Sequence, residues 1–286
     1  MLKNGHNMLK VDETLRPRNI LEYPPSNKQT FEEYFYDEYV KSNVNTDRIY
    51  IPIFWTNYYI SKNYGNGDLS KLQEVLDNLD RGKKYFTIVQ YDDNILNDLK
   101  DLDVLIFTQG GYGNYKEKSY VIPLNYQFNH QITNTTKDIF ASFIGNIKGR
   151  HSLRERMESL LINKDGYFIS ESINYDKFKD IMSRSLFSLC PRGYGQTSFR
   201  IFESLSIGSI PVYIYDDPLI PFENEFDFNE IGILIHESKL DRIDDILKSK
   251  SKSEIDNFII NGKSIYNNFF LYDGCYNKII NILNGI

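Results

Sequence analysis

The sequence of residues 185–217 is SLFSLCPRGYGQTSFRIFESLSIGSIPVYIYDD, and its pattern decides the fold. It begins with an apolar run that stops at Pro191, which predicts a strand buried on both faces. A glycine turn follows, and Thr197 or Ser198 is placed to cap a short helix that ends near Gly208. A second apolar run then resumes an extended conformation. Strand, glycine loop, helix and strand in this order are typical of a parallel sheet in an α/β protein.

This unit is suited to an anionic ligand. A glycine loop before a helix N-terminus presents backbone N–H groups and the positive end of the helix dipole, which favour a phosphate or diphosphate. Glu203, about one turn into the helix, could accept hydrogen bonds from ribose hydroxyls. Alternatively, Arg200 and Glu203 form an exposed helix pair, and the local pattern does not decide between the two interpretations. The candidate ligand-binding residues are Arg192, Gly193, Tyr194, Thr197, Ser198, Arg200 and Glu203.

The segment CPRGYGQTSFRIFESLSIGSIPV resembles the signature of the exostosin family of glycosyltransferases. In that family a Cys-Pro-x-Gly turn leads to Ser-x-Arg-x-x-Glu and then to a Gly-x-Ile-Pro-Val strand. The resemblance continues downstream in YDDPLIPF and FDFNEIGILIHESKL, and upstream in YFTIVQYDD, YVIPLNY and FIGNIKGRHSLRERM. It extends over residues 48–247.

The resemblance implies an α/β fold of the GT-B-like class, with two Rossmann-like domains facing a central cleft. A chain of 286 residues is long enough for two domains of about 130 residues, each with its own core. We expect an N-terminal acceptor-side domain at residues 1–130 that begins with an irregular lead-in, and a C-terminal nucleotide-sugar-binding domain at residues 138–270. A terminal helix at residues 271–286 is expected to pack back on the first domain. The polar segment Tyr126–Lys137 is the candidate linker.

The function implied by the resemblance is that of an inverting glycosyltransferase. Such an enzyme would transfer a sugar from a UDP-sugar, with UDP-xylose and UDP-glucuronate favoured, to a hydroxyl of a glycan or glycoprotein acceptor. The leaving diphosphate must be stabilised, and we assign this task to Arg192 and Arg200, with no strict metal requirement. The alternative is a catalytically inactive scaffold that binds a nucleotide sugar or an acceptor and assists an active glycosyltransferase.

A second strand, loop and helix precede this unit, in the segment FASFIGNIKGRHSLRERM. By the same reasoning its helix N-terminus is an anion site. The resemblance implies that Arg154 serves the diphosphate, because the family has an arginine at that place. Arg150, His151 and Arg156 could equally be solvated surface groups, and we favour this interpretation for Arg156.

The general base is less well defined by the sequence. Asp92 and Asp93 follow a predicted strand in the first domain, which is the usual place for groups that face a ligand crevice. Asp92 matches a His-Asp pair of the family, with Tyr91 in place of the histidine. Alternatively, the two carboxylates form a solvated turn that caps a helix predicted at residues 95–102. Asp68 and His151 are further candidates.

Composition restricts the class of protein and of partner. A net charge of −6 argues against general nucleic-acid binding, and two cysteines are too few for a disulfide framework. The N-terminal residues lack the apolar core of a signal peptide, and no apolar segment long enough to cross a membrane occurs. We therefore expect a soluble protein without a membrane anchor, of bacterial or viral origin, in the cytoplasm of a bacterium or of a virus-infected host. The sequence does not indicate the oligomeric state.

The first domain is expected to begin with two aromatic segments. Phe31, Tyr34, Phe35 and Tyr39 form a helical stripe, which favours core packing. The run at residues 48–59, RIYIPIFWTNYY, predicts a first strand. The remaining predicted elements are a helix at residues 69–79, strands at 85–91, 104–108 and 121–124, a glycine loop at 109–113, and, in the second domain, strands at 167–170 and 231–236, helices at 175–184 and 240–247, and two terminal helices at 253–286.

Overall fold

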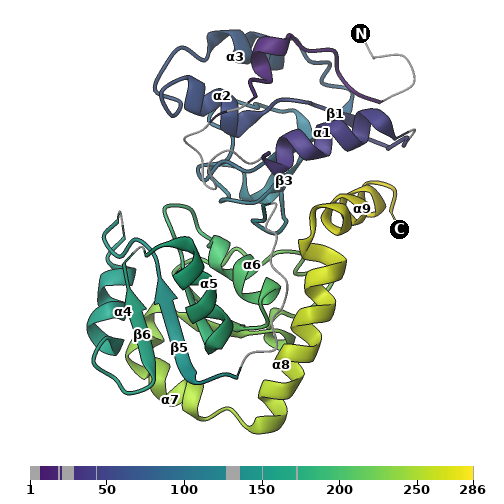
Figure 1. Cartoon of the computed structure of the whole chain (residues 1–286). Helices are drawn as coiled ribbons and strands as arrows, with labels where there is room; N and C mark the ends of the chain where they lie inside the picture. Colours follow the sequence, from purple (N-terminus) through teal and green to yellow (C-terminus); the bar gives the residue numbers. More distant parts are fainter. Residues whose placement is uncertain are drawn as a thin grey trace. The chain divides into compact units, whose positions relative to one another are not determined.

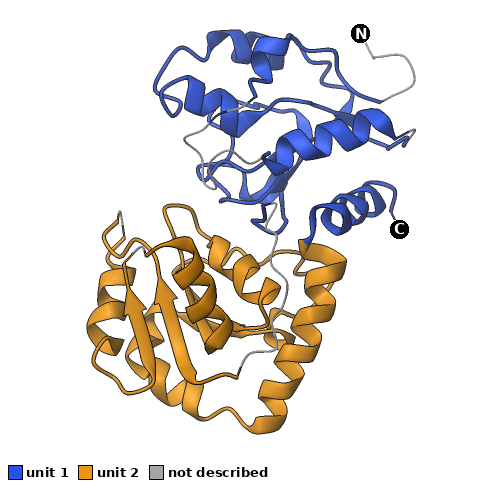
Figure 2. Ribbon diagram, in the orientation of Figure 1, with its two compact units in different colours: residues 1–127, 271–286 blue, residues 128–270 orange. Residues whose placement is uncertain are grey.

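The computed structural model describes residues 7–18, 20, 29–42, 44–126, 136–149, 151–171 and 173–285. They form two compact units: unit 1 contains residues 1–127 and 271–286, and unit 2 contains residues 128–270 (Figure 2). Each unit has a parallel sheet with helices against it, so the predicted α/β, GT-B-like fold class is confirmed. The predicted cleft between the two domains stays a prediction. Residues 127–135, most of the expected linker, and Arg150 lie outside the described residues.

The sheet of unit 1 has the order β1-β2-β3-β4, with every neighbouring pair parallel. Each strand is therefore added beside the preceding one in the same direction. The strands are β1 (Ile49–Tyr50), β2 (Lys84–Val89), β3 (Asp103–Thr108) and β4 (Ser119–Val121), and the helices of the unit are α1 (Phe31–Lys41), α2 (Trp55–Ser61), α3 (Ser70–Asp77) and α9 (Tyr272–Leu283).

The aromatic stripe of α1 packs in the core, as the sequence predicts. Phe31, Phe35 and Tyr39 are fully buried, and Thr30 begins the helix with a capping box to Glu33. The C-terminal helix α9 contacts α1, and its Tyr272 hydroxyl donates to the Gln29 carbonyl oxygen at 2.9 Å. A segment from the far end of the chain thus completes the aromatic core of unit 1.

The lead-in is fixed to unit 1 by backbone hydrogen bonds. Met8 forms a parallel bridge with Tyr50, beside the edge strand β1. Farther along, the Phe54 amide donates to the Leu15 carbonyl oxygen at 3.2 Å, and Leu15 is fully buried. Residues 7–18 are therefore part of the packed unit.

The strand predicted at residues 48–59 is wrong in its second half. Only Ile49–Tyr50 pair as β1, and helix α2 begins at Trp55. The buried carboxylate of Glu32, on α1, accepts from the Thr56 amide at 3.1 Å and from its hydroxyl at 2.8 Å. A carboxyl group from another helix thus lies at the N-terminus of α2, where it satisfies a backbone donor.

The helix predicted at residues 95–102 is also wrong. This segment is irregular, and Asn94 and Lys100 have positive φ values of 60° and 48°, which interrupt a right-handed helix. The side chain of Asn94 accepts from the Ile95 amide at 2.7 Å. Ile95, Leu99 and Leu102 are nevertheless buried, whereas Leu96 is 40% exposed, so the apolar pattern of the sequence identified core positions and not a helix.

The sheet of unit 2 has the order β6-β5-β7-β8-β9 and is parallel throughout (Figure 1). The connection from β5 to β6 through α4 and the connection from β6 to β7 through α5 run in opposite directions across the sheet. Because such crossovers are right-handed, α4 and α5 cover opposite faces. The strands are β5 (Ile139–Ile144), β6 (Tyr167–Ser170), β7 (Ser185–Pro191), β8 (Ile210–Tyr215) and β9 (Ile233–His236), and the helices are α4 (Leu153–Leu161), α5 (Tyr175–Arg184), α6 (Phe199–Ser206), α7 (Ile243–Lys248) and α8 (Lys252–Ile265).

The strand, loop, helix and strand predicted within residues 185–217 are confirmed as β7, α6 and β8. Phe187 and Leu189 of β7 and Val212 of β8 are fully buried in the core of unit 2, together with residues of α4 and α7. Ser198 is the N-cap of α6 and accepts from the Arg200 amide at 3.3 Å. Gly208 follows the helix with a φ of 70°, which favours glycine.

Candidate functional site

The carboxyl ends of β5 and β7 mark the point where the strand order of unit 2 reverses. From β5 the chain moves to β6 on one side, and from β7 it moves to β8 on the other. In open parallel sheets, ligands bind in the crevice at such a switch point. Among its described strands, unit 1 runs in sequence order without a reversal. The topology therefore directs attention to the loops that follow β5 and β7 in unit 2.

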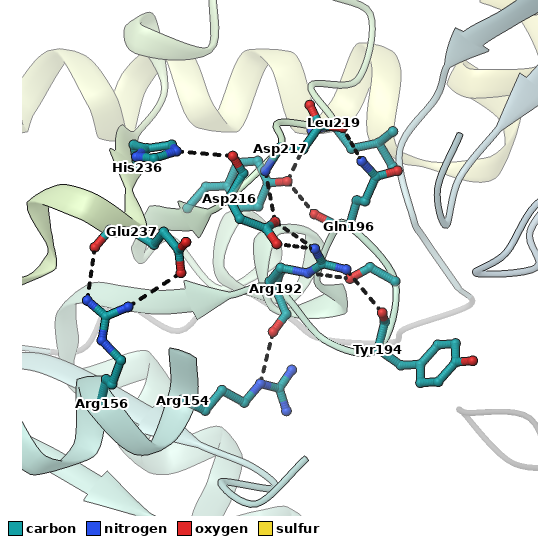
Figure 3. Close-up of polar contacts among 12 residues, drawn as sticks. Arg154, Arg156, Arg192, Tyr194, Gln196, Asp216, Asp217, Leu219, His236 and Glu237 are labelled. Atoms are coloured by element: carbon teal, nitrogen blue, oxygen red, sulfur yellow. Dashed lines mark hydrogen bonds and ion pairs between the residues drawn. The ribbon is translucent and has the colours of Figure 1, made fainter. Parts of the chain in front are cut away.

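Arg154, at the start of α4, spans the two loops at the switch point. Its Nη1 donates to the Asn146 carbonyl oxygen at 2.8 Å, in the loop after β5, and its Nε donates to the Arg192 carbonyl oxygen at 3.1 Å, after β7 (Figure 3). Within the described residues this guanidinium has no carboxylate partner, because its hydrogen bonds all go to carbonyl oxygens. Arg154 therefore holds the loops together and keeps its full positive charge.

Arg200, on the first turn of α6, also contacts the carboxyl end of β5. Its Nη2 donates to the carbonyl oxygen of Ile144, the last residue of β5, and its guanidinium lies 4.5 Å from the centre of the Phe178 ring. Its Nη1 forms an ion pair with Glu203 at 2.6 Å. The side chains of Arg200 and Glu203 are only 15% and 11% exposed, so the alternative of an exposed surface pair is wrong.

The two arginines influence each other electrostatically. Burial of the guanidinium and, to a smaller extent, the positive charge of Arg200 together lower the pKa of Arg154 to about 10. Arg200 Nε is buried and has no hydrogen-bond partner among the described residues. One negative charge, on Glu203, stands against two cations at this point, and a bound anion would relieve the imbalance.

Arg192 is held within the loop after β7 by its own hydrogen bonds. Its Nη1 donates to both carboxylate oxygens of Asp216, each at 2.6 Å, while Nε and Nη2 donate to the carbonyl oxygens of Gly195 and Tyr194 (Figure 3). The residue is 9% exposed. Most of its donors are used inside the loop, so in this structure Arg192 sets the shape of the loop, and its predicted contact with a diphosphate stays a prediction.

The other loop residues surround Arg154 and the start of α6. The Gly193 amide donates to the Thr197 carbonyl oxygen at 2.9 Å, which closes the loop. A Cβ atom at Gly193 would lie 3.2 Å from Arg154 Nη2, so glycine gives Arg154 its space. Thr197 and Ser198 are buried, whereas the ring of Tyr194 is 52% exposed. Their contacts with a ligand stay predictions.

Three polar residues near the loop were not among the candidates taken from the sequence. Asp216 accepts from Arg192, Asp217 accepts from Gln196 Nε2 at 2.6 Å, and the His236 ring is 3.1 Å from the Asp216 carbonyl oxygen. Asp216 and Asp217 follow β8, and His236 ends β9, so all three lie at the carboxyl edge of the sheet. Their position after predicted strands was the signal that could have identified them.

Arg156 lies two residues from Arg154 on α4 and points elsewhere. It pairs with Glu237 at 3.4 Å, and their side chains are 46% and 40% exposed. The interpretation of Arg156 as a surface residue is consistent with this exposure. His151, another candidate, lies just before α4 and is partly buried.

The predicted catalytic carboxylates belong to unit 1. Asp92 and Asp93 lie, half-buried, in a turn after β2, where the Asn94 amide donates to the Tyr91 carbonyl oxygen. Asp68 is exposed and accepts from the Ser70 amide at 2.9 Å at the start of α3; the hydrogen bonds from Ser70 lower its pKa. Asp68 therefore has a structural role in the turn before α3, and a catalytic role for any of the three stays a prediction.

The described residues contain neither a metal-binding cluster nor a helix able to cross a membrane. No group of three or more His, Cys, Asp or Glu side chains among them is arranged to hold a metal ion. Within the same residues, no helix has both the length and the apolar surface that crossing a membrane requires.

Solved structures of low sequence identity resemble the chain. They include TarM, at 10% identity and a TM-score of 0.44 over 74% of this chain and 52% of that one. Another is WaaG, a glycosyltransferase involved in lipopolysaccharide biosynthesis, at 13% identity and a TM-score of 0.42 over 80% of this chain and 70% of that one.

Curated relatives match shorter segments at higher identity. A probable glucuronosyltransferase of Oryza sativa subsp. japonica is 34% identical over 120 residues, which are 39% of this chain and 28% of that protein. A probable beta-1,4-xylosyltransferase of Arabidopsis thaliana is 40% identical over 68 residues, which are 24% of this chain and 16% of that protein. The chain thus matches less than a third of the length of either relative.

The relatives correct one expectation. They are plant proteins, so the expected origin in the cytoplasm of a bacterium or of a virus-infected host is wrong. That expectation was drawn from residue composition and from the N-terminal residues, and composition does not report the lineage of a protein. The Exostosin GT47 domain matches residues 107–250, half of the chain. The chain therefore belongs to the exostosin-like family of glycosyltransferases.

Proposed function

We propose that this protein is an inverting glycosyltransferase that transfers a sugar from a UDP-sugar to a hydroxyl of a glycan acceptor. The observation that carries the proposal is the pair Arg154 and Arg200 at the switch point of unit 2, where Glu203 pairs with Arg200 and is the one carboxylate among the described residues that pairs with either. A diphosphate at this point would balance the excess positive charge. The N-terminus of α6, capped by Ser198, adds the positive end of a helix dipole.

The leaving group is where these residues would act. When the bond between the sugar and the diphosphate breaks, negative charge develops on the phosphate oxygens, and fixed donors aimed at that charge stabilise the transition state. Arg154 and Arg200 are held in place by carbonyl oxygens before any ligand arrives, so little reorganisation is needed. Because their charges do the work that a metal could do, we expect no strict metal requirement.

The nucleotide and the sugar are finer parts of the proposal. Glu203 is one turn from the helix N-terminus, where its carboxylate could accept from ribose hydroxyls while it holds Arg200. The names of the plant relatives favour UDP-glucuronate or UDP-xylose as the donor. Asp92, Asp93 or Asp68 would act as the general base that takes the proton of the acceptor hydroxyl.

The test is the release of UDP from a panel of UDP-sugars, measured with and without glycan acceptors. The proposal expects release from one or two donors that accelerates with acceptor. Binding of UDP without turnover of any donor would contradict the enzymatic proposal and favour a scaffold. No binding of UDP would contradict both.

A further inference from the structure

A cavity of about 460 Å³ lies in unit 1. Its lining comes from the lead-in, from α1 and from the residue before α2. The size falls within the range of about 300–1,000 Å³ that is usual for ligand pockets. The lining residues, called here the lead-in pocket, are Glu13, Arg16, Arg18, Tyr36 and Phe54.

The lead-in pocket is built on fixed backbone. Leu15 is fully buried, and its carbonyl oxygen accepts from the amide of Phe54 at 3.2 Å. Two residues later, the Pro17 carbonyl oxygen accepts from Asn57 Nδ2 at 2.8 Å. These contacts lie on both sides of Arg16, so its position is set by the fold of unit 1.

Arg16 is an available cation in this pocket. Its guanidinium lies 4.5 Å from the centre of the Tyr36 ring, which orients it by a cation–π contact. Within the described part of the chain, Arg16 has neither a hydrogen-bond acceptor nor an ion-pair partner. Its forked N–H donors are therefore open to a ligand, and their geometry matches a carboxylate.

The positive charge of Arg18 is already balanced by a carboxylate of the protein. It pairs with Asp37 through two hydrogen bonds, of 3.1 and 2.6 Å, and lies 5.0 Å from the centre of the Phe54 ring. Glu13 brings a negative charge to the same pocket. The net charge offered to a ligand is small, which disfavours a diphosphate and suits a group with a single negative charge.

The remaining lining suits a sugar ring. The rings of Tyr36 and Phe54 meet edge to face, with centres 5.6 Å apart, and give the pocket an apolar surface. The Tyr36 hydroxyl and the Glu13 carboxylate have no hydrogen-bond partner among the described residues, so they can bind ligand hydroxyls. A uronate combines an apolar ring face, several hydroxyls and one carboxylate.

We infer that the lead-in pocket binds a carboxylate-bearing sugar residue of the acceptor, with Arg16 pairing the carboxylate. That the ligand is a saccharide rests on the proposed function, whereas the preference for a carboxylate rests on Arg16 and its surroundings. The pocket then selects anionic acceptors over neutral ones.

The experiment titrates the full chain with an oligoglucuronate, with the matching neutral glucose oligosaccharide and with inorganic phosphate. Wild type is compared with Arg16→Ala and Arg16→Lys, and with Lys83→Ala, which removes an exposed cation elsewhere in unit 1. The inference expects the oligoglucuronate to bind at least tenfold more tightly than the neutral oligosaccharide. Arg16→Ala abolishes this preference, Arg16→Lys retains part of it, and Lys83→Ala changes it less than twofold.

Three results would overturn the inference: equal binding of neutral and anionic oligosaccharides, full binding by Arg16→Ala, or phosphate binding as tight as uronate binding. Melting temperatures of the variants verify that each is folded. UDP is titrated into the same samples, because its proposed site is in unit 2. If wild type prefers the oligoglucuronate but does not bind UDP, the proposed donor site is contradicted; if wild type binds UDP but shows no preference for the oligoglucuronate, the lead-in pocket is contradicted.

Discussion

Arg200 Nη1 and Glu203 Oε2 are 2.6 Å apart across one turn of α6, and both side chains are largely buried. Buried ion pairs gain little net stability, because removing two charges from water offsets most of their attraction. Arg200 also reaches the carbonyl oxygen of Ile144 across the switch point. The pair therefore fixes a cation where β5 and β7 end.

Glu203→Gln should lower the free energy of unfolding. The substitution keeps the shape and leaves Arg200 without its counter-charge, so we expect unfolding free energy to fall by about 2 kcal/mol. Chemical denaturation measures this, with Glu155→Gln, an exposed position on α4, as the matched control. An unfolding free energy equal to that of the control would show that Glu203 does not balance Arg200.

Asp216→Asn tests whether Arg192 holds the glycine loop. Desolvation alone would raise the pKa of Asp216, but hydrogen bonds from Arg192 and the Asp217 amide, with the Arg192 charge, lower it below 3.8. Its stabilising effect is therefore present above pH 4 and is lost as the pH falls through the folded pKa. We expect the variant to lose about 1 kcal/mol at neutral pH and to show a weaker acid dependence in urea unfolding. Identical acid dependence in both proteins would contradict the assignment.

Glu32→Gln should change how the free energy of unfolding depends on pH between pH 5 and pH 9. Burial raises the pKa of Glu32 from 4.5 to about 8, although hydrogen bonds from Gln90 and Thr56 favour the charged form. The folded protein then keeps a proton that the unfolded chain releases, so the contribution of Glu32 to stability is greatest below pH 4.5 and is lost as the pH rises to about 8. The variant mimics the protonated acid, and we expect it to lack this decline, which amounts to roughly 5 kcal/mol. Parallel profiles between pH 5 and pH 9 would refute the raised pKa.

Gly113→Ala tests the loop that supports the predicted base. Gly113 has a φ of 50°, and a Cβ atom there would clash with the Asp93 carbonyl oxygen. We expect a loss of about 2 kcal/mol in unfolding free energy, from backbone strain and the clash together. Gly149→Ala is the control, because nothing lies within 4 Å of its added Cβ. If Asp93 acts in the reaction, kcat falls as well; a stability equal to that of the control would contradict the packing described.

Local patterns predicted unit 2 well because its elements depend on neighbouring residues. The apolar run before Pro191 and the cap at Ser198 define β7 and α6 without reference to the rest of the chain. Local patterns gave a wrong prediction for residues 55–59, where a contact with a distant residue determines that a helix forms instead of a strand. Helix α2 begins where Glu32, 24 residues earlier, accepts from Thr56, and no local pattern contains that contact.

The candidate site likewise contains residues that local patterns identify and residues that depend on distant contacts. The sequence identified Arg154 and Arg200 through a loop and helix pattern and a family resemblance, and the structure brings both to the switch point. The sequence could not reveal that Arg192 donates hydrogen bonds to Asp216, because that contact joins loops after two different strands. Nor could it identify Arg16, which depends on how the lead-in packs on Tyr36.

Calorimetric titration of UDP into Arg154→Ala is the most direct test of whether a diphosphate binds at the switch point of unit 2. The matched control is Arg156→Ala, on the same helix, whose side chain points to Glu237 (Figure 3). We predict that Arg154→Ala binds UDP about 2 kcal/mol more weakly than wild type, roughly a 30-fold loss, because a charge-assisted contact to the diphosphate is removed. Arg156→Ala should bind as wild type does. Equal UDP affinity for Arg154→Ala and wild type would contradict a diphosphate site at the switch point of unit 2.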